Sequence, residues 1–110
     1  MKNLQDIMKE HTSFSLRTFD GETPFTSLLK LGKELEELNV ELTRDVIDHS
    51  ALIEEYVDCI MCLLSSAARA DVNIEDLHKM FEKKVTKNIN RKWIKNPDGT
   101  YSHDKSLTNS

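Results

Sequence analysis

Apolar residues recur along most of the chain at spacings of three and four, the period of an amphipathic helix. The clearest run follows Thr23 and Pro24, which suit a helix cap and the first helical position. Its seam consists of Leu28, Leu31, Leu35, Leu38 and Leu42. Strand-like alternation is almost absent, and the chain has only 3 glycines and 2 prolines. The pattern predicts an all-α fold, a bundle of about four helices.

One helical segment is expected before this helix and another helix after it. A short amphipathic segment over residues 4–8 precedes a predicted loop over residues 11–22. Another helix is predicted over residues 51–70, with Asp48 or Ser50 placed to cap it. Because its middle is apolar almost all round, we expect it to be central and packed on several sides, including by another subunit.

The last predicted helix starts at Asn73 and continues to Lys95. The Asn-Pro-Asp-Gly sequence at 96–99 has the residue types of a turn and ends it. The polar segment 96–110 is expected to be a loose tail. The whole chain, residues 1–110, is expected to be one domain.

Length and charge narrow the classes of protein that fit. A chain of 110 residues has a small core, so oligomerisation would bury useful additional surface. The formal charge of -4 argues against a polynucleotide partner, since nucleic-acid-binding proteins usually carry a basic face. No run of about 18 apolar residues is present, and the N-terminus lacks the apolar core of a signal peptide. We therefore expect a cytoplasmic protein with no membrane partner.

Two acidic pairs have the same spacing, Glu34 with Glu37 and Glu55 with Asp58. Each pair shares one face of its helix, so antiparallel packing would bring four carboxylates together. Asp58 is the only charge in residues 56–68, and it needs a partner in that apolar stretch. Oxygen ligands without His or Cys favour Mg²⁺ or Mn²⁺ over zinc. The alternative is a solvated helix face, which is common in a chain with 19 acidic residues.

The last predicted helix carries the opposite charge. Lys84, Asn88, Arg91 and Lys95 recur at spacings of four, three and four, which predicts one polar stripe suited to phosphate oxygens. A basic helix end that favours the helix dipole is the alternative interpretation. Together with the acidic pairs, the stripe indicates a site for a phosphorylated, metal-chelating small molecule.

Neither the cysteines nor the histidines are predicted to be metal ligands. Cys59 and Cys62 form a C-x-x-C sequence, but no second Cys or His pair accompanies them, and both are expected to pack in the core. The histidines are expected at the surface: His11, His49, His78 and His103.

The order of the motifs resembles that of the MazG-like, all-α nucleoside triphosphate pyrophosphohydrolases: E-x-x-E, seventeen residues, E-x-x-D, then K-x-x-x-N-x-x-R. This match covers residues 30–93. The segment FSLRTF and the ending KNINRKWIKNPDGTYSH are similar to the dATP/dGTP pyrophosphohydrolase branch of phages and bacteria, near the MazZ-type diphosphohydrolases. The sequence departs from that branch at Phe14, Asp20 and Leu31, which leaves base preference open.

The resemblance implies a Mg²⁺-dependent enzyme that hydrolyses a purine deoxynucleoside triphosphate, dGTP or dATP, to the monophosphate, releasing pyrophosphate or two phosphates. Both acidic pairs would be metal ligands and catalytic residues. The residues that would bind phosphate are Lys84, Asn88 and Arg91. Those placed for base or sugar contacts are Ser15, Phe19 and Trp93. Family members are homodimers or homotetramers, which agrees with the apolar helix over 51–70.

Two alternatives stay open. The same fold can act on another or a modified nucleotide in a house-cleaning role. A non-catalytic helical module can instead use its apolar helix faces to bind another protein.

Overall fold

The computed structural model describes residues 1–105 and divides into two compact units, residues 1–74 and a second unit that begins at Glu75. Over the described residues the chain forms four helices and one two-stranded antiparallel sheet. The predicted helical character is confirmed, whereas the sheet was not predicted. The interpretation of residues 1–110 as one domain stays a prediction.

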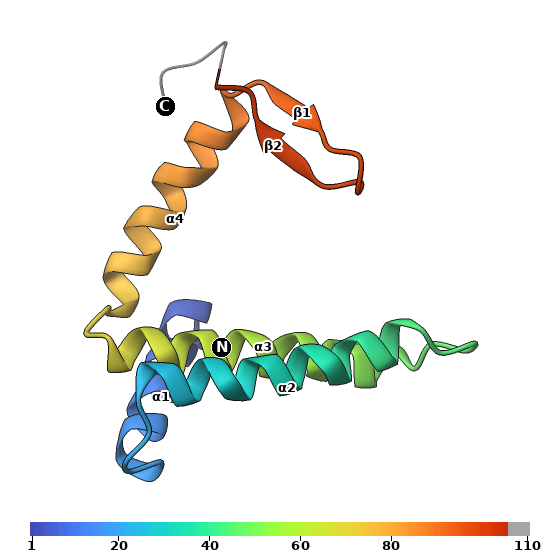
Figure 1. Cartoon of the computed structure of the whole chain (residues 1–110). Helices are drawn as coiled ribbons and strands as arrows, with labels where there is room; N and C mark the ends of the chain where they lie inside the picture. The colour runs from blue at the N-terminus through green and yellow to red at the C-terminus, as the bar shows by residue number, and fades with distance from the viewer. Residues whose placement is uncertain (106–110) are drawn as a thin grey trace. The chain divides into compact units, whose positions relative to one another are not determined.

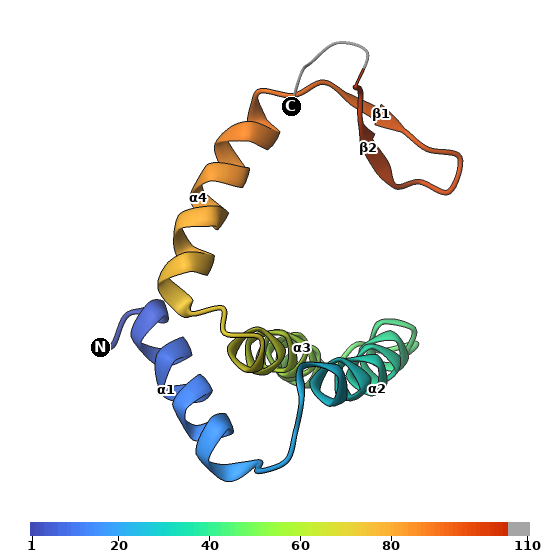
Figure 2. The same ribbon diagram turned by 60° about the vertical axis from the view of Figure 1, so that its left-hand side comes forward.

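Helices α2 (Pro24–Leu42) and α3 (His49–Arg69) lie side by side and antiparallel (Figure 1; end-on in Figure 2). The predicted cap of α2 is confirmed: the Thr23 hydroxyl accepts the Thr26 N–H at 3.1 Å, and the Thr26 hydroxyl accepts the Thr23 N–H at 2.8 Å. Of the two candidates for α3, Asp48 is the cap, and its carboxylate accepts the Ala51 N–H at 3.2 Å.

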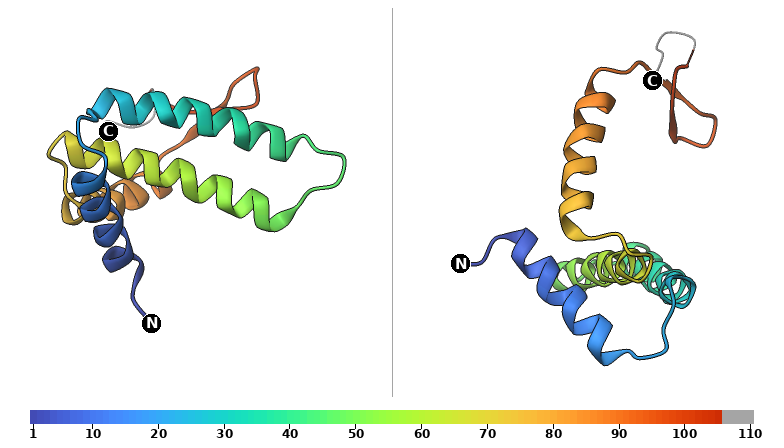
Figure 3. Two further views of the ribbon diagram at one scale, coloured as in Figure 1. Left: turned by 90° about the horizontal axis from the view of Figure 1, so that it is seen from below. Right: turned by 90° about the vertical axis from the view of Figure 1, so that its left-hand side faces the viewer.

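Helix α1 (Leu4–Thr18) is longer than the sequence predicts and crosses the C-terminal half of α3 (Figure 3). Its second half, residues 11–18, falls in the predicted loop 11–22, so that prediction was wrong. Serine and threonine have modest helix propensity, but tertiary contacts override it. The decisive contact is Ser15, which is fully buried with its hydroxyl oxygen 2.9 Å from that of Ser65 on α3.

Few apolar side chains are buried within the chain. Among the described residues, the buried apolar side chains are Cys59, Leu64 and Ile74. Several large apolar side chains of α3 are exposed: Ile53, Tyr56, Val57, Ile60 and Leu63. Within the first unit α3 packs against α1 and α2, and its packing against another subunit stays a prediction.

Helix α4 (Ile74–Ile89) belongs to the second unit from Glu75 onward and leads to a hairpin of β1 (Trp93–Lys95) and β2 (Tyr101–His103). The helix ends at Ile89, so its predicted extension to Lys95 was wrong. Arg91 follows the helix and Lys95 lies in β1, and the helical stripe of the prediction stops at Asn88.

A side chain takes over the hydrogen bond that would have continued α4. The indole N–H of Trp93 donates to the backbone oxygen of Asn88 at 3.0 Å, the acceptor that the Lys92 N–H would use in a longer helix. Trp93 then pairs with His103 in the β-hairpin, so residues 93–95 form a strand and not a continuation of α4. The predicted turn at 96–99 is confirmed.

Gly99 has a φ of 90°, which suits glycine in this turn. Its N–H donates to the Asn96 oxygen at 3.0 Å. Strand β2 falls within the segment 96–110 that was expected to be loose, and residues 106–110 of that segment lie outside the described residues.

Candidate functional site

Three of the four predicted acids meet between α2 and α3. One carboxylate oxygen from each of Glu34, Glu37 and Glu55 lies within 4.8 Å of the other two. Glu34 and Glu37 share a face of α2 because three residues separate them, and Glu55 joins them from α3. We call these three residues the acidic cluster.

The acidic cluster is partly shielded from water. Glu34 is 6% exposed and Glu55 is half-buried, and the Oε2 atom of each is buried without a hydrogen-bond partner in residues 1–105. Burial, followed by the negative charges of Glu37, Glu34 and Asp58, raises the pKa of Glu55. Lys30 offsets part of this charge through an ion pair of 3.2 Å with Glu34. Buried, unpaired carboxylate oxygens in such a group fit a divalent cation with oxygen ligands.

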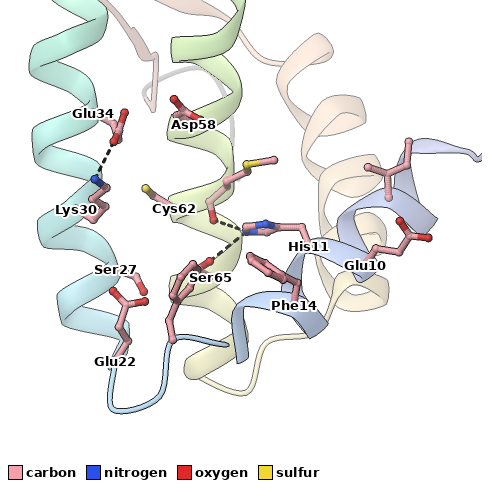
Figure 4. A pocket seen from close by; sticks show the side chains of 13 residues that line it. Glu10, His11, Phe14, Glu22, Ser27, Lys30, Glu34, Asp58, Cys62 and Ser65 are labelled. Atoms are coloured by element: carbon pink, nitrogen blue, oxygen red, sulfur yellow. Dashed lines mark hydrogen bonds and ion pairs between the residues drawn. The ribbon is translucent and has the colours of Figure 1, made fainter. Parts of the chain in front are cut away.

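Asp58, the fourth predicted acid, lies outside the acidic cluster. It is half-buried on α3, one turn from Glu55, and with Glu34 it lines the adjacent cavity (Figure 4). Its charge reaches the cluster, because it contributes to the raised pKa of Glu55. A role for Asp58 as a metal ligand stays a prediction.

A cavity of about 680 Å³ runs from the acids toward the α1–α2 connection. Figure 4 shows Glu34, Lys30, Ser27 and Glu22 in succession along one side. On the opposite side lie Asp58, Cys62 and Ser65 of α3, and α1 contributes a third wall. The α1 and connection residues that line it are Ile7, Glu10, His11, Phe14, Phe19 and Glu22. The first unit therefore holds an acidic end and an aromatic end in one cavity.

Helix α1 is attached to α3 by a buried polar network. The Arg69 guanidinium donates to the Ser15 hydroxyl and backbone oxygen, both at 3.0 Å, and to the Phe19 oxygen at 3.1 Å. The Nε2 atom of His11 lies 3.0 Å from the Met61 oxygen and 3.1 Å from the Ser65 hydroxyl. His11 is half-buried by these contacts, so its prediction as a surface residue was wrong.

The predicted phosphate-binding residues belong to the second unit. Lys84 is exposed on α4. Asn88 is half-buried, and its side-chain oxygen accepts from Arg91 at 3.2 Å. Trp93 is 44% exposed in β1. Binding of phosphate or nucleotide by these residues stays a prediction.

Of the other two predicted nucleotide contacts, Phe19 lines the cavity. Ser15 is 0% exposed, and its hydroxyl is engaged by Ser65 and Arg69. The structure therefore places Ser15 in the support of α1. A nucleotide contact by either residue stays a prediction.

The sequence model of the dATP/dGTP pyrophosphohydrolase family matches residues 7–108. The chain belongs to this family. It is therefore an enzyme that hydrolyses nucleotides, which sets aside the non-catalytic alternative.

A solved structure supports the fold of this dATP/dGTP pyrophosphohydrolase family member. It is described as a cyanophage S-2L MazG-like pyrophosphohydrolase bound to dGDP and three catalytic Mn²⁺ ions per active site. The two chains are 19% identical with a TM-score of 0.70, and the match covers 94% of this chain and 99% of that one. No curated protein sequence matches this family member. Over residues 1–105, no helix has the length and apolar character needed to cross a membrane.

Among the residues that line the cavity of this pyrophosphohydrolase, sequence reasoning did not assign Ser27, Lys30, His11 or Cys62 to the site. Ser27 and Lys30 lie seven and four residues before Glu34, so helical spacing alone places them on its face. Cys62 lies four residues after Asp58, so the same spacing places it on the face of that acid, whereas His11 carried no comparable signal. The position of His11 in the cavity depends on how α1 packs against α3, which the sequence pattern does not indicate.

Proposed function

We propose that this pyrophosphohydrolase converts a purine deoxynucleoside triphosphate, dATP or dGTP, into its monophosphate in a Mg²⁺-dependent reaction, with Mn²⁺ as an alternative cation. The observation that carries the proposal is the acidic cluster. Two of its oxygens are buried and unpaired within the described part of the chain, and it adjoins a cavity in a member of this family.

Four acids hold the cation in this proposal: Glu34, Glu37, Glu55 and Asp58. A divalent cation bound there supplies charge that polarises phosphoryl oxygens and lowers the pKa of a coordinated water. Three of these carboxylates, those of the acidic cluster, are fixed on two packed helices with their oxygens already together. Burial and the neighbouring negative charges raise the pKa of Glu55, so a cation beside it would favour its charged form.

Phosphate oxygens are assigned to Lys84, Asn88 and Arg91. Arg91 offers a planar fork, Lys84 a point charge and Asn88 an amide donor. For the nucleoside part we assign Phe19, which lines the aromatic end of the cavity, and Trp93, which is 44% exposed. We further propose a homo-oligomer, a dimer or a tetramer, because the exposed apolar side chains of α3 would leave water on association.

Chromatography of dATP, dGTP, dCTP and dUTP after incubation with Mg²⁺, Mn²⁺ or EDTA tests this function. We expect the monophosphate from the two purine substrates with either cation and none with EDTA. Phosphate released with and without added inorganic pyrophosphatase distinguishes pyrophosphate from two separate phosphates. If all four substrates stay intact with both cations, the proposed function is wrong.

Matched variants test the acidic cluster. Glu55→Gln is expected to lower activity by more than about 100-fold, because it removes a ligand charge while preserving size. Glu54→Gln is the control, since Glu54 is the exposed neighbour on α3 and lies outside the cluster. Equal activity in the two variants would contradict the assignment.

A further inference from the structure

Ser27 has a buried hydroxyl that the structure leaves unused. The residue is 3% exposed, it lines the cavity, and its Oγ atom has no hydrogen-bond partner among residues 1–105. A buried serine inside a helix can bond the backbone oxygen four residues earlier. Here that oxygen, on Thr23, accepts the Ser27 N–H at 3.2 Å and the Thr26 hydroxyl at 3.1 Å instead. A buried donor without a partner destabilises the fold, so a ligand that accepts a hydrogen bond from it binds more tightly.

The neighbouring polar groups of the cavity already have partners. Lys30 pairs with Glu34, the His11 ring and the Ser65 hydroxyl bond each other, and Glu22 lies 3.7 Å from Arg69. Among the hydroxyl groups of residues 1–105 that line the cavity, the Ser27 hydroxyl is therefore the one without a hydrogen-bond partner.

The position of Ser27 relative to the acids suits the base of a nucleotide. Glu34 lies seven residues further along the same face of α2, which is about 10 Å of helix at 1.5 Å per residue. Ser27 therefore lies about two helical turns from the acidic end, on the side of the cavity where the base of a nucleotide would lie if its phosphates bind the cation. Phe14 and Phe19 form an edge-to-face pair at this end, with ring centroids 5.5 Å apart, and provide apolar surface for a ring system.

We propose that the Ser27 hydroxyl contacts the six-position of the purine base, and this assignment rests on the proposed function. Adenine carries an amino donor at that position and guanine an oxygen acceptor, so a group with fixed polarity would favour one of them. A hydroxyl rotates, donating to guanine and accepting from adenine. Ser27 therefore determines that one cavity accepts both purines.

A double substitution, one on the protein and one on the substrate, tests the contact. The kcat/KM values of wild type and Ser27→Ala are measured with dATP, dGTP and the deoxynucleoside triphosphate of purine, which has hydrogen at the six-position. We expect Ser27→Ala to lower kcat/KM for dATP and dGTP by about three- to tenfold, the contribution of one hydrogen bond. The unsubstituted purine should be hydrolysed equally well by both proteins.

Ser66→Ala is the matched control. Ser66 is a buried serine of α3 outside the cavity lining, and its hydroxyl donates to the Pro24 oxygen at 2.9 Å. This variant should change kcat/KM for all three substrates by the same factor. Ser27→Cys, which keeps the size and weakens the hydrogen bond, should give the same ranking as Ser27→Ala, and a melting curve establishes that each variant is folded.

The outcomes separate the two proposals. If Ser27→Ala lowers kcat/KM for all three substrates by the same factor, or for none of them, the proposed contact is wrong while the proposed function stands. If the wild type hydrolyses none of the three, both proposals are wrong. If the loss appears with dGTP and not with dATP, Ser27 reads one purine, and the claim that it accepts both is overturned.

Discussion

Replacement of Arg69 by Met should destabilise the attachment of α1 more than any exposed arginine change. The Arg69 side chain is 6% exposed and makes three hydrogen bonds of 3.1 Å or less to Ser15 and Phe19. The acceptors each keep another partner, because the Ser15 hydroxyl retains Ser65 and both backbone oxygens retain an N–H donor. The loss is therefore that of the bonds themselves, about 1 kcal/mol for each and roughly 3 kcal/mol in total.

Urea unfolding at one fixed protein concentration measures this change, since association would otherwise shift the apparent stability. Thermal unfolding should show a fall of about 10 °C or more, at roughly 4–8 °C per kcal/mol for a small domain. Arg69→Lys should lower the free energy of unfolding by about half as much as Arg69→Met, because one ammonium group cannot reach both Ser15 and Phe19 as the guanidinium fork does.

Arg44→Met is the matched control. Arg44 pairs with Glu41 at 3.0 Å, but its side chain is 53% exposed, so little change is expected. If Arg69→Met costs less than about 1 kcal/mol, or no more than the control, the buried network does not hold α1. A second readout follows from the cavity wall: KM for the nucleotide should rise more than kcat falls, since α1 carries His11 and Phe14.

Two other predictions concern titratable groups. Because the pKa of Glu55 is raised in the folded, metal-free protein, protonated Glu55 stabilises the fold below its ordinary range, and this stability is lost as pH rises through the raised pKa. In Glu55→Gln the melting temperature should no longer fall as the pH rises above that range, so at pH 7 in EDTA it should exceed that of the wild type. The variant should also lose its stabilisation by Mg²⁺. A dependence of the melting temperature on pH that matches the wild type would contradict this prediction. Burial, then the charge of Glu34, raises the pKa of the Cys62 thiol, so iodoacetamide should label it at pH 8 much more slowly than free cysteine. Labelling of Cys62 at the rate of free cysteine would show an accessible thiolate.

The amino-acid pattern predicted α2 and α3 well because their signals are local. The leucine spacing, the Thr23 cap and the Asp48 cap each depend on residues within one or two turns. The acids at i and i+3 follow from the same helical geometry, so the pattern placed Glu34 and Glu37 on one face before any packing was known.

Long-range contacts decided the remaining elements. Residues 11–18 are helical because Arg69 and Ser65, some fifty residues away in sequence, satisfy and bury the end of α1. Helix α4 ends early because the Trp93 indole takes the Asn88 oxygen and β1 finds β2. Periodicity cannot report either event.

The sequence by itself determined the helical fold, the family and which acids share a face of each helix. Tertiary structure alone decided that Glu55 joins Glu34 and Glu37 while Asp58 lines the cavity beside them. It also decided that Ser15 supports α1 and that the Ser27 hydroxyl is left unpaired. The reason is physical: helical spacing fixes which residues share a face, whereas burial and hydrogen-bond partners depend on which other element packs against that face.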